Sequence, residues 1–148
     1  MRRTGAVIRL LLLLVLMLAP APASAGQDGL PAEAEPLTGA EFEALTTGRT
    51  LTYGIGGEPY GIERYMAGRR VIWAFLGDEC REGHWFEDGA RICFVYDDAP
   101  GELHCWHFFE AEQGLLARIA GAGESSGELV EVRESPEPMH CPGPRVGV

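Results

Sequence analysis

Residues 80–96 read CREGHWFEDGARICFVY, and this stretch decides the fold. Aromatic and β-branched residues alternate with polar ones on both sides of Asp88-Gly89. That pair favours a tight hairpin turn of type I′, because aspartate and glycine tolerate positive φ. The stretch therefore predicts two antiparallel strands, near 80–86 and 91–96.

The same period of two continues in both directions. We expect further strands near 49–53, 61–66, 69–76, 103–110, 115–120 and 128–134, separated by short turns that contain glycine or aspartate. Connections this short force neighbouring strands to be antiparallel. The predicted fold is mostly β: a meander of about eight short strands that forms a small barrel or a curved sheet.

One short helix is expected before the first strand. Thr38 and Glu41 have the spacing of a capping box, and Phe42 and Leu45 follow at helical spacing. Gly48 is placed to end the helix. The stretch 71–76 is apolar on both faces, so we expect this helix to cover its second face.

The N-terminus has the three parts of an export signal. Arginines precede an apolar run over residues 10–18, and Ala23-Ser24-Ala25 follows as a cleavage site. We expect a signal peptide over 1–25, a flexible leader over 26–36 and one disulfide-stapled domain over 37–148. The mature protein would be periplasmic or secreted, with no stable membrane anchor, because the apolar run is too short to span a bilayer.

The charge limits the partners. Cleavage removes three arginines and no acid, which changes the formal charge from −10 to −13. A nucleic-acid partner is disfavoured, because phosphate contacts need clustered cations. The chain also contains no lysine, which excludes a lysine Schiff base.

The four cysteines indicate two disulfides, because an exported chain enters an oxidising compartment. If the loop over 97–102 closes symmetrically, Cys93 lies opposite Cys105, and Cys80 is left to pair with Cys141. The second bond would hold the proline-rich C-terminal tail. The Asp88-Gly89 turn would place His84 opposite Cys93.

This register also sorts the aromatic side chains between the two faces of the sheet. Trp85, Ile92 and Trp106 are expected to form a ladder across three strands. The ladder is either packed core or the wall of an apolar ligand pocket, and Trp85, Tyr96 and Trp106 are the candidate ligand-facing residues. His104 and His107 point to opposite faces, so no metal site is expected.

No catalytic residue and no cofactor are predicted. The chain has neither a Gly-x-Ser-x-Gly elbow nor a glycine loop that leads into a helix.

Two resemblances are visible. Residues 82–89 resemble one hairpin of the MORN repeat. Residues 38–120, with Cys93-Phe94-Val95-Tyr96 and Cys105-Trp106, resemble short exported proteins of proteobacteria that have no characterised activity. The second resemblance implies an envelope location and a β fold.

Two functions follow as hypotheses. The first is an exported, soluble, non-catalytic envelope protein that binds a protein partner or a small apolar ligand. The alternative is an inhibitor of a secreted hydrolase, such as a lysozyme or a protease, since an acidic surface suits a basic enzyme.

Overall fold

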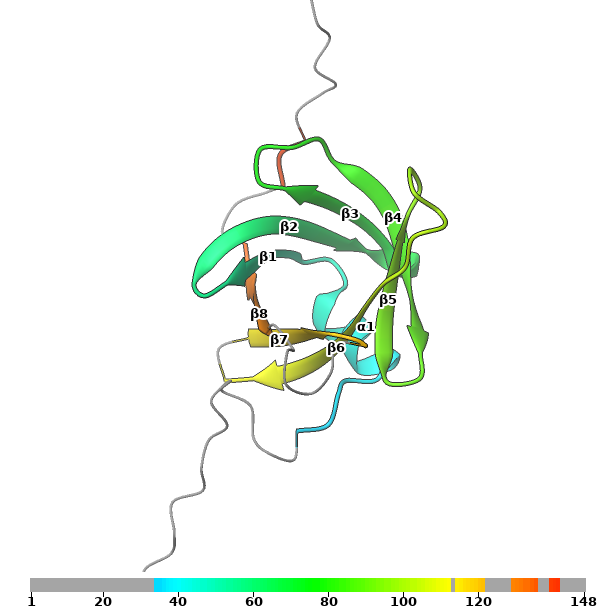
Figure 1. Cartoon of the computed structure of the whole chain (residues 1–148), viewed down its shortest axis with the longest axis vertical. Helices are drawn as coiled ribbons and strands as arrows, with labels where there is room; N and C mark the ends of the chain where they lie inside the picture. Colours follow the sequence, from blue (N-terminus) through cyan, green and yellow to red (C-terminus); the bar gives the residue numbers. More distant parts are fainter. Residues whose placement is uncertain (1–33, 113, 122–128, 136–138, 142–148) are drawn as a thin grey trace, which may run out of the picture.

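The computed structural model describes residues 34–112, 114–121, 129–135 and 139–141 of the chain. In this part, eight antiparallel strands close into a barrel in sequence order, and one helix precedes them (Figure 1). The helix is α1 (Gly39–Thr46), and a 3₁₀ turn, η1 (Ala67–Arg69), joins the second and third strands. The strands are β1 (Thr50–Ile55), β2 (Glu58–Met66), β3 (Arg70–Phe75), β4 (Arg81–Asp88), β5 (Arg91–Tyr96), β6 (His104–Ala111), β7 (Gly114–Ile119) and β8 (Leu129–Glu134).

The prediction of a mostly β meander with one short helix is confirmed. The sheet closes because β1 pairs with β8 as well as with β2. Closure leaves no free sheet edge. The expected signal peptide, most of the leader and most of the proline-rich tail lie outside the described residues.

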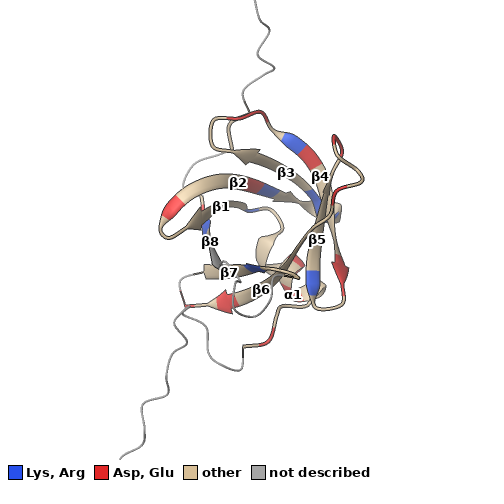
Figure 2. Cartoon of the chain, viewed as in Figure 1, with Lys and Arg blue, Asp and Glu red and all other residues tan. Residues whose placement is uncertain are grey.

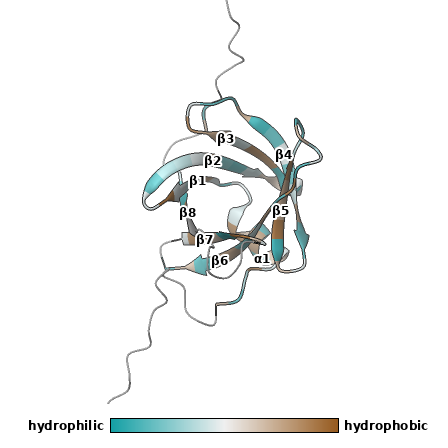
Figure 3. Ribbon diagram, viewed as in Figure 1, coloured by the Kyte–Doolittle hydropathy of each residue, from teal (hydrophilic) through white to brown (hydrophobic). Residues whose placement is uncertain are grey.

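Alternating residues of each strand face the barrel interior, and the apolar runs are longest on β3 and β5 (Figure 3). Trp85, Phe94 and Phe108 are buried on the inner face. The outer face of the same strands carries His84 and the Cys93–Cys105 disulfide. The faces that the sequence predicted for these residues are therefore the faces that the structure shows.

The predicted register of the β4–β5 hairpin was wrong by two residues. Phe86, and not His84, lies opposite Cys93, because Asp88 stays in the strand and pairs with Arg91. The turn is centred on Gly89 and Ala90, and only the glycine has positive φ, which fits a type II′ turn and not type I′. A shift of two residues preserves the faces.

The corrected register also changes the predicted ladder of Trp85, Ile92 and Trp106, because Trp85 has a different partner. Trp85 lies opposite Phe94, and Ile92 lies opposite Trp106 as expected. Phe94 in turn lies opposite His104. Cross-strand pairs of this kind are the units that stabilise a sheet, so the inner face is still a continuous aromatic surface.

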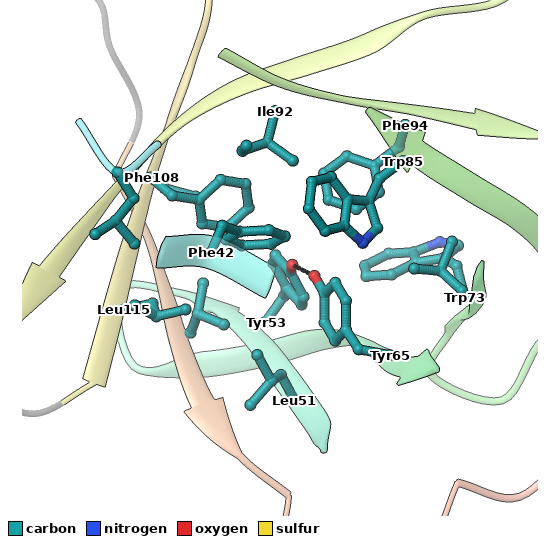
Figure 4. Packing of buried hydrophobic residues seen from close by; sticks show 14 of the residues in the cluster. Phe42, Leu51, Tyr53, Tyr65, Trp73, Trp85, Ile92, Phe94, Phe108 and Leu115 are labelled. Atoms are coloured by element: carbon teal, nitrogen blue, oxygen red, sulfur yellow. Dashed lines mark hydrogen bonds between the residues drawn. The ribbon is translucent and has the colours of Figure 1, made fainter. Parts of the chain in front are cut away.

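The helix does not cover the second face of 71–76, where the sequence placed it. The capping box of Thr38 and Glu41 is formed, but α1 lies at one end of the barrel. Phe42 enters the interior and is fully buried against rings from four strands (Figure 4). These rings belong to Tyr65, Trp85, Phe94 and Phe108. With the helix elsewhere, Leu76 on that face remains exposed.

Both expected disulfides are present. Cys93 and Cys105 are directly opposed on β5 and β6. The Cys80–Cys141 bond joins the loop after β3 to the C-terminal segment, across 61 residues of sequence. Disulfides of this kind persist in oxidising compartments such as the periplasm or the extracellular space.

Among the described residues, no helix has both the length and the apolar character needed to cross a membrane.

Candidate ligand-binding cavity

The barrel holds a cavity of about 210 Å³ at the end opposite α1. The lining residues near its mouth lie where β2, β4 and β6 begin and where β3 and β5 end, which is the same end of an antiparallel barrel. Every lining residue except a glutamate and an arginine carries an aromatic ring. The lining consists of Tyr53, Tyr60, Glu63, Trp73, Phe75, Arg81, Phe94, Tyr96, His104 and Trp106.

One wall of the cavity comes from β1, β2 and β3. The Trp73 ring lies 5.3 Å from the Tyr53 ring, 6.0 Å from the Tyr60 ring and 5.4 Å from the Phe75 ring, between centroids. Gly61 allows this arrangement, because a Cβ at that position would overlap the Trp73 indole. The indole therefore approaches the backbone of β2 at Gly61 and is surrounded by three other rings.

The facing wall comes from β5 and β6. It is formed by Phe94 and Tyr96 on one strand and by His104 and Trp106 on the other. The Tyr96 and His104 rings lie 5.9 Å apart. Aromatic rings on both sides suit an apolar ligand or a cation, which interacts favourably with the negative face of a ring.

The first wall also contains a buried carboxylate, Glu63 on β2, which is only 2% exposed. The Tyr65 hydroxyl donates to Glu63 Oε2 at 2.9 Å, and the Tyr96 hydroxyl donates to Oε1 at 3.0 Å. The Tyr53 hydroxyl lies 3.4 Å from Oε2 and also contacts the Tyr65 hydroxyl, as the dashed line in Figure 4 shows. Three strands therefore supply hydrogen-bond donors to one carboxylate.

Burial raises the pKa of the Glu63 carboxyl to about 7, although the hydrogen bonds from Tyr65, Tyr96 and Tyr53 oppose the rise. Burial raises the pKa of all three tyrosines as well, and the negative charge of Glu63 adds to that effect. The tyrosines therefore keep their protons and act as donors. Within the described residues, no ion pair is formed by Glu63.

Arg81 is the cation that lines the cavity, and its charge is already balanced. Its Nε and Nη2 atoms donate to the two carboxylate oxygens of Asp98 at 2.7 and 2.8 Å. This bidentate contact lowers the pKa of Asp98. The guanidinium carbon also lies 4.8 Å from the centre of the Tyr96 ring. Arg81 thus forms part of the cavity wall but does not neutralise the charge of Glu63.

The mouth of the cavity is apolar and acidic. All five large hydrophobic side chains that the described residues leave exposed lie at this end, with 39–60% of their surface accessible. They are Ile55, Phe75, Leu76, Leu103 and Ile119. Carboxylates crowd the loops around them (Figure 2). These carboxylates belong to Glu58, Asp78, Glu79, Asp97, Asp98 and Glu102.

Of the three candidate ligand-facing residues, two line the cavity and one does not. Tyr96 and Trp106 line the cavity. Trp85 does not, because it packs edge-on against Phe42 of the helix, with ring centroids 5.1 Å apart. Trp85 therefore belongs to the packed end of the barrel, where the Arg69 guanidinium lies 4.6 Å from the centre of its ring.

The sequence analysis missed Glu63, Arg81 and Trp73. A glutamate within a strand usually faces solvent, and no paired carboxylate marks Glu63. One signal was available: Glu63 and Tyr65 are two residues apart in an expected strand, so they share a face with each other. Had the burial of Tyr65 been inferred, the same alternation would have placed Glu63 in the interior.

No family model matches this chain, and neither a curated protein nor a solved structure matches it. The described residues also hold no cluster of three or more side chains with metal-ligand chemistry.

Proposed function

We propose that this chain is an exported binding protein that holds one small, largely apolar ligand inside its barrel. The observation that carries the proposal is the aromatic cavity of about 210 Å³, open at one end and closed by α1 at the other. An eight-stranded barrel has room either for packed side chains or for one small ligand. Sites for small molecules are typically apolar with a few converging polar groups, which describes this cavity.

The size of the cavity sets the size of the ligand. An apolar cavity of about 150 Å³ is large enough for benzene. A volume of about 210 Å³ therefore accommodates an aromatic ring with a short chain. The exposed apolar residues of the mouth would contact any part of the ligand that extends outward.

Tryptophan fluorescence tests the proposal, because Trp73 and Trp106 line the cavity. We expect small aromatic compounds to change the emission with saturation at one site per chain. The His104→Trp variant places a larger ring at the mouth of the cavity and should weaken or abolish the change. The matched control is His84→Trp on the exposed outer face of β4, which should retain it. Equal binding by both variants would exclude the cavity as the site.

A second function is favoured by the exposed loop residues Leu76 and Leu103, which flank the mouth together with several carboxylates. Apolar side chains on protruding loops, ringed by negative charge, suit insertion into the cleft of a basic enzyme. We propose inhibition of a secreted hydrolase as this alternative. Titration against lysozymes and exported proteases tests it. Loss of enzyme activity that weakens with salt would support it, and full activity at all concentrations would refute it.

A further inference from the structure

The charged groups of the cavity allow its ligand to be specified further. Arg81 is neutralised by Asp98 at two contacts, whereas Glu63 receives only hydrogen bonds from tyrosine hydroxyls. A buried carboxylate without an ion-pair partner is costly, because burial disfavours its charged form. A ligand that brings a positive charge into the cavity removes that cost.

We propose that the natural ligand is an aromatic or alkyl amine whose ammonium group binds the Glu63 carboxylate. This inference rests on the proposed function, since it names the chemical class of the ligand in that same cavity. The ammonium would donate to Glu63 and lie against the rings of the two walls, and the apolar part would point toward the mouth.

Two features of the site match an ammonium group: the acceptor capacity of Glu63 and the tryptophan rings of the walls. Each carboxylate oxygen of Glu63 can accept more than one hydrogen bond, and Oε1 receives one from Tyr96. Hydrogen bonds between an ammonium and a carboxylate are about twice as strong as neutral ones. Trp73 and Trp106, from opposite walls, supply the ring type that binds cations best.

The mouth of the cavity also favours a positively charged ligand. Six carboxylates lie in the loops and strand ends around the opening, where Arg81 pairs with Asp98 and Arg70 pairs with Asp97. A negative rim raises the local concentration of cations and speeds their association. An anionic ligand would meet repulsion at the rim and again at Glu63, so this arrangement discriminates between the two charges.

Three probes that share a 2-phenylethyl group and differ in the polar group test the proposal by calorimetry: 2-phenylethylamine, 2-phenylethanol and 3-phenylpropionate. We expect the amine to bind at least about tenfold more tightly than the alcohol, since a hydrogen bond between two charged groups replaces one that involves a neutral group. The carboxylate should bind most weakly. In Glu63→Gln the preference for the amine should vanish, whereas Glu82→Gln, on the exposed outer face of β4, should keep it.

A second measurement needs no variant. Because the pKa of Glu63 is about 7, binding of the amine at pH 7 should release about half a proton per site, and binding of the alcohol should release none. Calorimetry in buffers of different ionisation enthalpy reports this number.

The outcomes separate the two proposals. If the amine and the alcohol bind equally, or if the carboxylate binds best, the amine inference is wrong but the cavity is still a binding site. If none of the three probes binds and the fluorescence of Trp73 and Trp106 does not change, the proposed function itself fails. Tight binding of the amine without proton release would place its charge away from Glu63 and would also overturn the inference.

Discussion

The two ends of the barrel are built from the same alternation of inward aromatic residues, yet one end is packed and the other is hollow. At the closed end, Phe42 of α1 enters the interior and meets Tyr65, Trp85 and Phe108. At the open end, no described element supplies such a side chain, and the inward rings line a cavity instead. The difference comes from a segment outside the sheet and not from the strands.

We call α1 with Phe42 the plug of the barrel. Hydrogen bonds and an ion pair hold this plug against the strands. The Gly39 amide donates to Glu87 Oε1 of β4 at 2.8 Å, and the Leu37 amide donates to the Phe108 carbonyl of β6 at 2.7 Å. Arg69, after β2, donates twice to Glu43 Oε2. These contacts join the helix and its preceding residues to β4, β6 and the turn after β2.

The largest expected effect is at the plug. Phe42→Ala should lower the free energy of unfolding by about 3–5 kcal/mol, because it removes a fully buried ring and leaves a cavity. Phe75→Ala, at the open end, should cost less than about 1 kcal/mol, since nearly half of that side chain is exposed. Urea denaturation measures both. Equal losses would mean that the two ends are packed alike.

The next effect is the pH dependence that Glu63 introduces. Its pKa is about 7 in the folded state and about 4.5 when exposed, so the folded protein binds this proton more tightly. The protein should therefore lose about 3 kcal/mol of stability as the pH rises from 4.5 through 7, and no more above that range. Glu63→Gln should remove this loss, as urea denaturation across the pH range would show.

The other groups that face Glu63 should not mimic this effect. Tyr53 on β1, Tyr65 on β2 and Tyr96 on β5 have raised pKa values and remain protonated. Arg81 on β4 remains a cation, with its pKa raised by Asp98. Tyr60 on β2 and His104 on β6 are the other titratable residues of the lining, so the comparison is best made in a His104→Gln background. A slope that survives Glu63→Gln there would assign it to another group.

A smaller effect is expected at the start of the plug. Thr38→Ala removes the side chain that accepts from the Glu41 amide and should cost about 1 kcal/mol. Thr47→Ala, at the exposed C-terminal end of the same helix, is the matched control and should change stability by less than about 0.5 kcal/mol. Thermal unfolding compares the two, and identical melting temperatures would show that the capping box does not stabilise the helix.

Local features of this fold could be predicted from the sequence, but only part of the site could: Tyr96 and Trp106 were expected in the cavity wall, and Glu63 was not. Strand positions, the capping box and the Cys93–Cys105 pair each depend on nearby residues and on simple periods. The position of Phe42 inside the barrel could not be predicted, because it depends on closure between β1 and β8. Glu63 was missed for the same reason. A glutamate in a strand is predicted to be exposed, and its burial here follows only from the closed barrel.

The smallest expected effect is at the mouth. Leu103→Ser should change the free energy of unfolding by less than about 0.5 kcal/mol, because 60% of the side chain is exposed. Leu37→Ser, outside the strands at the closed end, should cost about 2 kcal/mol or more, since Leu37 packs into the core cluster. Urea denaturation compares this matched pair. If Leu103→Ser were as costly as Leu37→Ser, the mouth would be part of the packed core, and a ligand could enter the barrel only after that end had opened.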